Sequence, residues 1–287
     1  MELVRRPGPS VRVRVEEHRA DPDSDRVVRR EDRLATEEPL EVRLAWPGSP
    51  ATRVGVTMRT PGQDFELAVG MLLAEGLLSP TALSTVAYCT DVQLSREQEF
   101  NVVTVTLSEP PPRDVSSRAA TVTAAASACG VCGTESIDDV LRLTGVHGRA
   151  VPALVSSEVL RSLPARLRER QRIFATTGGL HAAALADTSG ELLLLREDIG
   201  RHNAVDKVYG ARVLAGEPTA TPVLLVSGRI GFEIVQKAVA AGAGLLAAIG
   251  APSSLAARLA AEAGLGLVGF LSAERFVVYA GGDRIGV

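Results

Sequence analysis

The sequence predicts an α/β protein, with a layered domain in its C-terminal half and a smaller mixed α/β subdomain before it. Apolar runs with the length of buried strands fall at 181–187, 191–196, 222–227, 244–249, 265–270 and 275–280. Segments with the length of helices accompany them, at 201–214, 231–242 and 253–263. Such alternation is typical of a layered α/β domain. The length of 287 residues is consistent with about two domains.

Composition and charge argue against several functional classes. The net charge is −3, which does not favour a broad basic surface for nucleic acid. The basic start at Arg5 runs into prolines and a glycine, so no secretory signal is visible. The longest apolar run, 238–251, is shorter than the roughly 20 residues of a membrane helix. We therefore expect a cytoplasmic protein with reduced cysteines, without nucleic acid or membrane as a partner.

The first 36 residues are charged and predicted to be irregular. Val11, Val13 and Val15 alternate with charged residues, which suits one half-exposed strand. A solvated edge explains the arginines of this segment more simply than a binding surface does.

A mixed α/β subdomain is predicted over 37–118, with strands at 40–46, 52–59, 86–94 and 100–107. A helix begins at Asp64, which can cap it, and ends at Gly76. Arg59 and Asp64 are the polar residues of interest at this strand-to-helix turn. Cys89 in the third strand is predicted to be a small buried hydrophobic residue.

Two cysteines share one short stretch of small residues. Cys129 and Cys132 lie two residues apart in S-A-C-G-V-C-G-T-E-S, after a run of alanines. We expect a mobile, accessible loop over 119–135, because no bulky side chain anchors it. A helix predicted from Ser136 would point its positive end back at Cys132 and favour the thiolate.

Four functions are compatible with paired cysteines. A thioredoxin-type redox couple normally has a bulky residue nearby, whereas glycine follows each cysteine here. A zinc site needs about four ligands, and neither Cys89 nor the four histidines shows a second paired spacing. A zinc deaminase needs H-x-E before P-C-x-x-C, but His181 follows the cysteines and lacks the glutamate. A sulfur carrier, which holds a persulfide on a swinging loop, fits a flexible small-residue segment best.

The densest polar cluster, 196–207, marks a second candidate site. Gly200 ends a strand there, and the helix that follows carries charged residues on shared faces. A buried salt-bridge network and a phosphate contact at a helix N-terminus explain this cluster equally well. Glycine turns at 176–181 and 227–233 resemble it, and such loops gather at the carboxyl ends of strands. The candidate residues for an anionic ligand are Gly178, Gly179, His181, Asp198, Arg201, His202, Asn203, Lys207, Ser227 and Arg229.

Together these residues resemble the FdhD family, the sulfur-carrier and accessory proteins of formate dehydrogenase. The resemblance runs in order from about residue 37 to the C-terminus. Its segments are Met58-Arg59-Thr60-Pro61-Gly62, Glu75-Gly76, Cys129-Gly130-Val131-Cys132-Gly133, Thr177-Gly178-Gly179, His181-Ala182-Ala183, 196–207, Ser227-Gly228-Arg229 and Val268-Gly269-Phe270. The charged first 36 residues have no clear counterpart in the family.

The resemblance implies a cytidine-deaminase-like domain over 136–287 and a homodimer. It also implies a sulfurtransferase-type accessory role, in which a cysteine desulfurase loads a persulfide onto Cys129, with Cys132 as partner thiol. The sulfur would pass to the molybdenum of a bis-(molybdopterin guanine dinucleotide) cofactor destined for formate dehydrogenase. That cofactor would bind transiently, and neither a permanent cofactor nor a metal is expected.

The family's cofactor-binding segment falls on Phe270, Leu271, Ser272, Ala273, Glu274 and Arg275. Arg275 is the safer phosphate contact, because Glu274 would repel a phosphate. Two alternatives stay open: a chaperone that presents the cofactor without moving sulfur, and a zinc-binding C-x-x-C protein.

Overall fold

The computed structural model describes residues 8–20, 26–89, 100–115 and 151–286. Cys129, Cys132, the predicted loop at 119–135 and the helix predicted from Ser136 lie outside these residues. The described part is a mixed α/β structure with several sheets.

The N-terminal part consists of a hairpin and a four-stranded sheet. Its strands are β1 (Ser10–Arg19), β2 (Arg26–Ala35), β3 (Glu38–Trp46), β4 (Ser49–Arg59), β5 (Leu83–Tyr88) and β6 (Val102–Leu107). Helix α1 (Asp64–Ala74) follows β4, and a short 3-10 helix (Pro80–Ala82) precedes β5. The sheet has the order β4-β3-β6-β5, with β3 and β6 parallel and the other pairs antiparallel.

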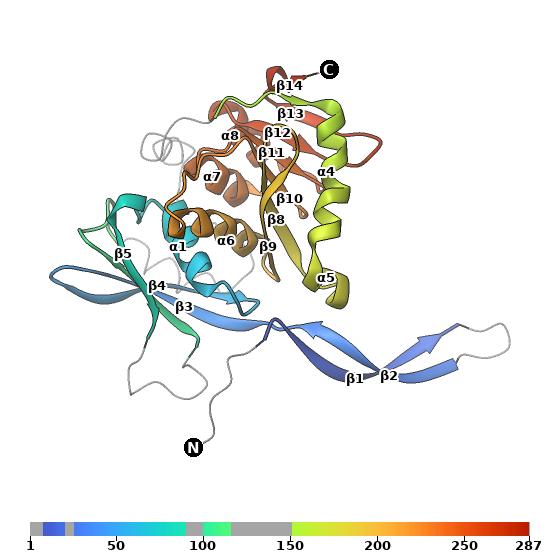
Figure 1. Ribbon diagram of the computed structural model, residues 1–287, viewed down its shortest axis with the longest axis horizontal. Coiled ribbons are helices and arrows are strands. Elements are labelled where there is room, and N and C mark those ends of the chain that lie inside the picture. The colour runs from blue at the N-terminus through green and yellow to red at the C-terminus, as the bar shows by residue number, and fades with distance from the viewer. Residues whose placement is uncertain (1–7, 21–25, 90–99, 116–150, 287) are drawn as a thin grey trace.

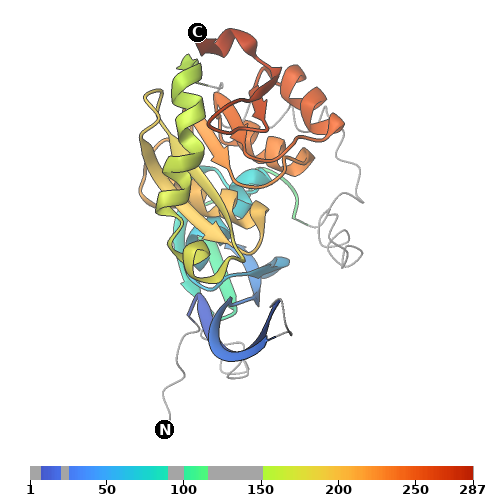
Figure 2. The same ribbon diagram turned by 90° about the vertical axis from the view of Figure 1, so that its right-hand side faces the viewer.

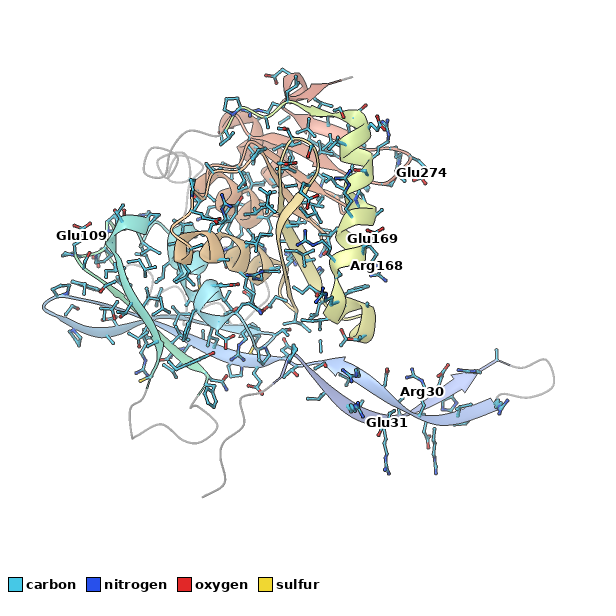
Figure 3. The ribbon with its side chains drawn as sticks, in the orientation of Figure 1. Arg30, Glu31, Glu109, Arg168, Glu169 and Glu274 are labelled. Atoms are coloured by element: carbon cyan, nitrogen blue, oxygen red, sulfur yellow. The ribbon has the colours of Figure 1, made fainter. Side chains whose placement is uncertain are left out.

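The hairpin of β1 and β2 extends away from the body of the molecule (Figure 1). The prediction of irregular structure was wrong for 26–35, because this segment pairs with β1 along its whole length. Cross-strand ion pairs support the pairing, such as Arg29 Nε to Glu16 Oε1 at 2.9 Å. Charged side chains line the hairpin, Arg30 and Glu31 among them (Figure 3).

The C-terminal domain confirms the predicted alternation of strands and helices. Its strands are β7 (Val155–Ser156), β8 (His181–Ala186), β9 (Leu192–Asp198), β10 (Val223–Val226), β11 (Leu245–Ala248), β12 (Gly266–Gly269), β13 (Val277–Ala280) and β14 (Ile285–Gly286). Its helices are α4 (Ser157–Arg170), α5 (Arg172–Thr177), α6 (Arg201–Leu214), α7 (Phe232–Ala240) and α8 (Ser254–Glu262). A 3-10 helix (Gly282–Arg284) precedes β14, which pairs with β7. Helix α5, the 3-10 helix and the short strands β7 and β14 were not predicted.

Six of these strands form one sheet with helices on both faces. The order is β13-β12-β11-β10-β8-β9, and β10, β11 and β12 are parallel. Leucines of α4 pack on one face, and Figure 2 shows this helix running over the sheet. Residues of α6, α7 and α8 pack on the other face, in a core that continues through α1 to the four-stranded sheet.

Helices α1 and α6 cross at two glycines. A Cβ atom on Gly70 would lie 1.9 Å from the carbonyl oxygen of Asp206, and one on Gly210 would lie 1.8 Å from that of Glu66. No side chain fits at either position, so the two backbones touch directly. This contact joins the N-terminal subdomain to the C-terminal domain.

The start of α1 differs from its prediction. Gln63 is the N-cap, and Asp64 is the first helical residue. The Asp64 carboxylate instead accepts hydrogen bonds from Arg59 Nε at 2.9 Å and from the Tyr88 hydroxyl at 2.7 Å. Both partners of this Arg59–Asp64 ion pair are buried, so it ties the strand, the turn and the helix together. Gly76 ends α1 at φ 65°, as predicted.

Cys89 is only half buried, which corrects the prediction of a buried residue. It follows the last residue of β5, and its sulfur lies 3.9 Å from Arg43 Nη1.

In the described ranges, none of the helices combines the length and the apolar character needed to cross a bilayer.

The crossing of α1 and α6 generates a stability prediction. In an open helical position, alanine would be about 1 kcal/mol more favourable than glycine. At Gly70 the added methyl group would collide with the backbone of α6, so we expect Gly70→Ala to lower the free energy of unfolding by about 2 kcal/mol or more. Urea denaturation measures this change. Gly282→Ala is the control, because a Cβ there meets nothing within 4 Å. Equal stability of the two variants would contradict the tight crossing.

Candidate functional site

The glycine turns of the C-terminal domain gather at one edge of the six-stranded sheet. The parallel strands β10, β11 and β12 end there at Val226, Ala248 and Gly269. Strand β8 runs antiparallel to β10, so β8 begins at this edge. Its first residue, His181, pairs with Asp198 at the end of β9. The carboxyl edge therefore collects the three turns that the sequence singled out.

Glycines let the loops at this edge approach closely. A Cβ on Gly250 would lie 2.6 Å from the carbonyl oxygen of Gly228, and one on Gly269 would lie 2.8 Å from Pro252 Cδ. The amide of Phe270 donates to the carbonyl oxygen of Gly250 at 3.1 Å. The loops after β10, β11 and β12 are thus held against one another by backbone contacts.

A cleft of about 560 Å³ opens beside this edge. Its volume lies in the usual range of small-molecule sites. Four of the predicted residues line it: Gly178, Gly179, His181 and Ser227. Its other lining residues were not predicted: Pro164, Arg168, Gln171, Phe174, Leu180 and Ile249. Three of these, Pro164, Arg168 and Phe174, come from α4 and α5. The charged run at 166–172 is the sequence signal that could have drawn attention to this wall.

Arg201 and His181 both lie close to Gly228. A Cβ on Gly228 would be 3.2 Å from His181 Nδ1 and 3.5 Å from Arg201 Cδ. Arg201 is the first residue of α6, and its Nε is buried without a hydrogen-bond partner among the described residues. Burial, followed by the nearby Arg201 charge, lowers the pKa of His181. The imidazole of His181 lines the cleft, and the unsatisfied guanidinium N–H of Arg201, near the same glycine, is a group that suits an anion.

His202 faces α7. Its Nε2 lies 3.1 Å from Glu233 Oε2, and both side chains are less than a third exposed. Burial, with the charges of Lys237 and Arg201 next, lowers the pKa of His202 to about 3. The contact with Glu233 links α6 to α7.

Asp198, Asn203 and Lys207 join one buried network. Lys207 Nζ lies 2.6 Å from Asp198 Oδ2 and donates to the carbonyl oxygen of Thr60 at 3.0 Å. Asn203 Nδ2 donates to Asp198 Oδ1 at 3.0 Å and to the carbonyl oxygen of Met58 at 2.8 Å. These three predicted site residues fasten α6 and β9 to the turn after β4. None of them lines the cleft.

Two further ion pairs surround the crossing of α1 and α6. Lys237 Nζ lies 2.7 Å from Asp206 Oδ1 and joins α7 to α6. Arg196 Nη2 donates to Glu66 Oε1 at 2.7 Å and joins β9 to α1. The cluster at 196–207 therefore contains both the salt-bridge network and, through Arg201, an unsatisfied cationic group.

The segment Phe270 to Arg275 connects β12 to β13. Phe270 has φ 51°, a left-handed value that is uncommon for a residue with a Cβ, and its side chain is 42% exposed. Leu271 is buried, whereas Ser272 Oγ organises a turn and donates to Glu274 Oε2 at 2.8 Å. This hydrogen bond lowers the pKa of Glu274. Arg275 Cζ lies 5.8 Å from the centroid of the Phe270 ring.

The remaining predicted residues are exposed at the same edge. Ala273 lies at the tip of the 270–275 turn, and Arg229 lies in the loop after β10. Cys129 and Cys132 fall outside the described residues, so their distance from the cleft is not defined. Within the described ranges no group of three or more metal-ligating side chains is present.

Comparison with known proteins places the chain in context. The model of the FdhD/NarQ family matches residues 35–286. The sulfur carrier protein FdhD of Mycobacterium tuberculosis is 46% identical over 270 residues, which cover 91% of this chain and 95% of that protein. The protein of the same name from Streptomyces coelicolor is 48% identical over 262 residues, covering 89% of this chain and 90% of that protein.

A crystal structure of a proposed formate dehydrogenase accessory protein from Desulfotalea psychrophila has a similar fold. The two structures match with a TM-score of 0.70 over 96% of this chain and 99% of that chain, at 20% sequence identity. At this identity the match concerns the fold.

The buried network generates a prediction about stability. Lys207→Met would leave the Asp198 carboxylate buried without its cation, so we expect a loss of about 3 to 5 kcal/mol of unfolding free energy. The double variant Asp198→Asn/Lys207→Met removes the unpaired carboxylate charge as well, so it should regain part of the lost unfolding free energy. Arg29→Met, in an exposed ion pair, is the control and should change stability by about 0.5 kcal/mol or less. A Lys207→Met protein as stable as this control would overturn the role of the network.

His202 generates a prediction about pH. Its pKa is about 3 in the folded protein and about 6.5 when unfolded, so between these values only the unfolded state binds the proton. Stability therefore decreases as pH falls from 6.5 towards 3. We expect His202→Gln to flatten this decrease by up to about 1 kcal/mol per pH unit, measured by urea unfolding at pH 8, 6 and 5. The pH 8 comparison isolates the packing cost, and parallel pH profiles would contradict the assignment.

Proposed function

Because the chain belongs to the FdhD/NarQ family, we propose that it is a sulfur carrier and accessory protein for formate dehydrogenase. The single observation that supports this most strongly is the family match over 35–286, which contains both Cys129 and Cys132. The cytidine-deaminase-like layering and the homodimer belong to the same proposal. Helices on both faces of the six-stranded sheet are compatible with that layering.

The loading step uses Cys129 as the nucleophile. Its thiolate attacks the outer sulfur of a persulfide on a cysteine desulfurase. A new S–S bond forms at Cys129, the S–S bond of the donor breaks, and the donor leaves as a thiolate. The sulfane sulfur changes its carrier without a net change in oxidation state. Glycines on both sides of each thiol suit a segment that must reach two different partners.

The delivery step uses Cys132. Its thiolate attacks the inner sulfur of the Cys129 persulfide, which forms a Cys129–Cys132 disulfide and releases sulfide. The two thiols supply the two electrons that this reduction needs. The acceptor is the molybdenum of a bis-(molybdopterin guanine dinucleotide) cofactor, which is a substrate and is bound transiently.

The carboxyl edge is the proposed binding region for this acceptor. Arg201, Arg229 and Arg275 supply cationic groups along one edge, and the cleft lies beside them. Arg201 offers an unsatisfied N–H, which is the strongest of these indications. The exposed turn at 270–275 adds the segment that the family resemblance assigns to the cofactor.

A second candidate function is a chaperone that binds and presents the cofactor without transferring sulfur. The observation that favours it is the cleft itself, which is lined by described residues of the C-terminal domain. A zinc-binding protein is a third candidate, and metal analysis of the purified protein tests it directly.

Persulfide loading tests the proposal. After incubation with a cysteine desulfurase and cysteine, mass spectrometry should show one added sulfur atom at Cys129. Cys132→Ala should still be loaded but should fail to release sulfide, whereas Cys129→Ala should not be loaded. Cys89→Ala is the matched control, because the proposal gives this thiol no part in transfer. A folded protein without sulfur at Cys129 would count decisively against sulfur transfer. Active formate dehydrogenase formed with Cys129→Ala would favour the chaperone.

A further inference from the structure

The hairpin of β1 and β2 receives little support from the rest of the described chain. It extends away from the body of the molecule (Figure 1), and within the described residues neither strand pairs with a third strand. No side chain of β1 or β2 is fully buried. A two-stranded ribbon of this kind is marginal in water by itself, and its outer edges carry backbone groups that can bind another molecule.

The two faces of the hairpin differ in charge. Residues opposite each other across an antiparallel ladder share one face, and successive residues of a strand alternate between faces. The register pairs Arg12 with Arg33 and Arg14 with Glu31. Three arginines therefore cluster on one face near the root of the hairpin, where β1 begins and β2 ends. We call these three residues the basic face; the opposite face carries the alternating valines of β1.

The pairing of Arg12 with Arg33 is unfavourable by itself, because like charges directly opposite each other destabilise a ladder. Arg12 Nη1 lies 3.7 Å from Glu31 Oε2, whereas Arg14 and Arg33 make no ion pair with any described residue. Nearer the tip of the hairpin, cross-strand ion pairs match the charges instead. The root thus carries uncompensated positive charge, which a carboxylate from another molecule would neutralise.

The composition of the hairpin favours a protein over a nucleic acid as the partner. Strands β1 and β2 carry seven arginines and four carboxylates, whereas the whole chain has a net charge of −3. The interspersed carboxylates would repel a phosphate backbone. Val11, Val27 and Leu34 are each about half exposed among these charges. Arginines beside exposed apolar groups are typical of protein interfaces, and the positive excess selects an acidic surface.

The root of the hairpin lies next to the cleft. A Cβ atom added to Gly179, which lines the cleft, would lie 3.6 Å from the Cβ of Ala35 at the end of β2. Strand β2 also contacts α5, which contributes Phe174 to the cleft lining. A protein that is bound by the hairpin is therefore held beside the region proposed for the cofactor.

We propose that the basic face of this hairpin docks an acidic surface of the enzyme that receives the cofactor. Carboxylates of that enzyme pair with Arg14 and Arg33, and they relieve the repulsion between Arg33 and Arg12. This inference rests on the proposed function, because that function makes formate dehydrogenase the recipient. It adds the surface of contact, since residues 10–34 lie outside the part of the chain that the family model matches.

Binding of the full chain to purified, cofactor-free formate dehydrogenase from the same organism tests the proposal by biolayer interferometry. Arg14→Thr/Arg33→Thr removes two charges, keeps residues that favour strands and leaves the ion pairs of the hairpin in place. We expect about tenfold weaker binding at low salt, mainly through slower association, and a smaller difference at high salt.

The matched control is Arg53→Thr/Arg258→Thr. It removes the same charge from exposed positions on β4 and α8, outside the hairpin. We expect this control to bind formate dehydrogenase as the wild-type protein does. An equal loss of binding in the control would overturn the proposal, because it would assign the effect to net charge.

Amide hydrogen exchange separates docking from folding of the hairpin. The double variant removes the repulsion between Arg12 and Arg33, so β1 and β2 should exchange as slowly as in the wild-type protein or more slowly. Weaker binding together with faster exchange in the hairpin would overturn the proposal, since the arginines would then serve folding.

Other partners give different results. The proposal is wrong if the double variant binds formate dehydrogenase with wild-type affinity, or if the wild-type protein does not bind it. It is also wrong if the variant loses only its binding to a short DNA duplex or to a cysteine desulfurase. Sedimentation that shows a wild-type dimer and a monomeric variant would assign the basic face to a second copy of this chain instead.

Persulfide loading of Cys129 separates this proposal from the proposed function. We expect Arg14→Thr/Arg33→Thr to be loaded as the wild-type protein is. Absent loading in the wild-type protein would contradict sulfur transfer while leaving the docking result intact. Normal loading, with undiminished binding of the variant to formate dehydrogenase, would contradict only the docking surface.

Discussion

The direct backbone contact between α1 and α6 is the constraint on which the arrangement of this protein depends. Gly70 and Gly210 leave room for the carbonyl groups of the opposing helix, and no larger residue fits. Because the helices touch so closely, the turn after β4 is brought against the start of α6. Lys207 can then bind both Asp198 and the Thr60 carbonyl oxygen. Burying these charges is tolerable only because each has a partner at hydrogen-bond distance.

The candidate site inherits its geometry from this contact. Helix α6 begins with Arg201, and its position along the sheet edge follows from where the network holds its first two turns. The parallel strands β10, β11 and β12 bring three glycine-bearing loops to the same edge, where small residues let them pack. The opposite wall is fixed from the sheet through Glu197. The result is a cleft lined by residues of α4, α5 and the sheet edge, with the unsatisfied Nε of Arg201 close to its lining residue His181.

The proposed chemistry divides between two kinds of structure. Binding a large anionic cofactor favours fixed walls, since prepositioned groups lose little entropy when the ligand arrives. Passing a sulfur atom between partners favours a segment that can reach both, and the glycines around Cys129 and Cys132 suit that task. The chain carries both compositions: aliphatic residues in the core that packs α4 on the sheet, and an alanine, glycine and serine stretch around the thiols.

The sequence by itself determined the alternation of strands and helices after residue 171, because apolar period and glycine position are local properties. The sequence also indicated which turns meet at the sheet edge. Its motifs, taken in order, indicated the family. Tertiary structure decided what local patterns do not encode. Strand β2 forms through pairing with β1, α5 is held by the distant Glu197, and Asp64 bonds Arg59 instead of capping its helix. The cluster at 196–207 shows most clearly what sequence alone leaves undecided. The same spacing of charged residues along a helix serves a buried salt-bridge network and a ligand contact equally well. Only the tertiary contacts separate Lys207, whose charge is paired with Asp198, from Arg201, whose buried Nε has no partner within the described structure.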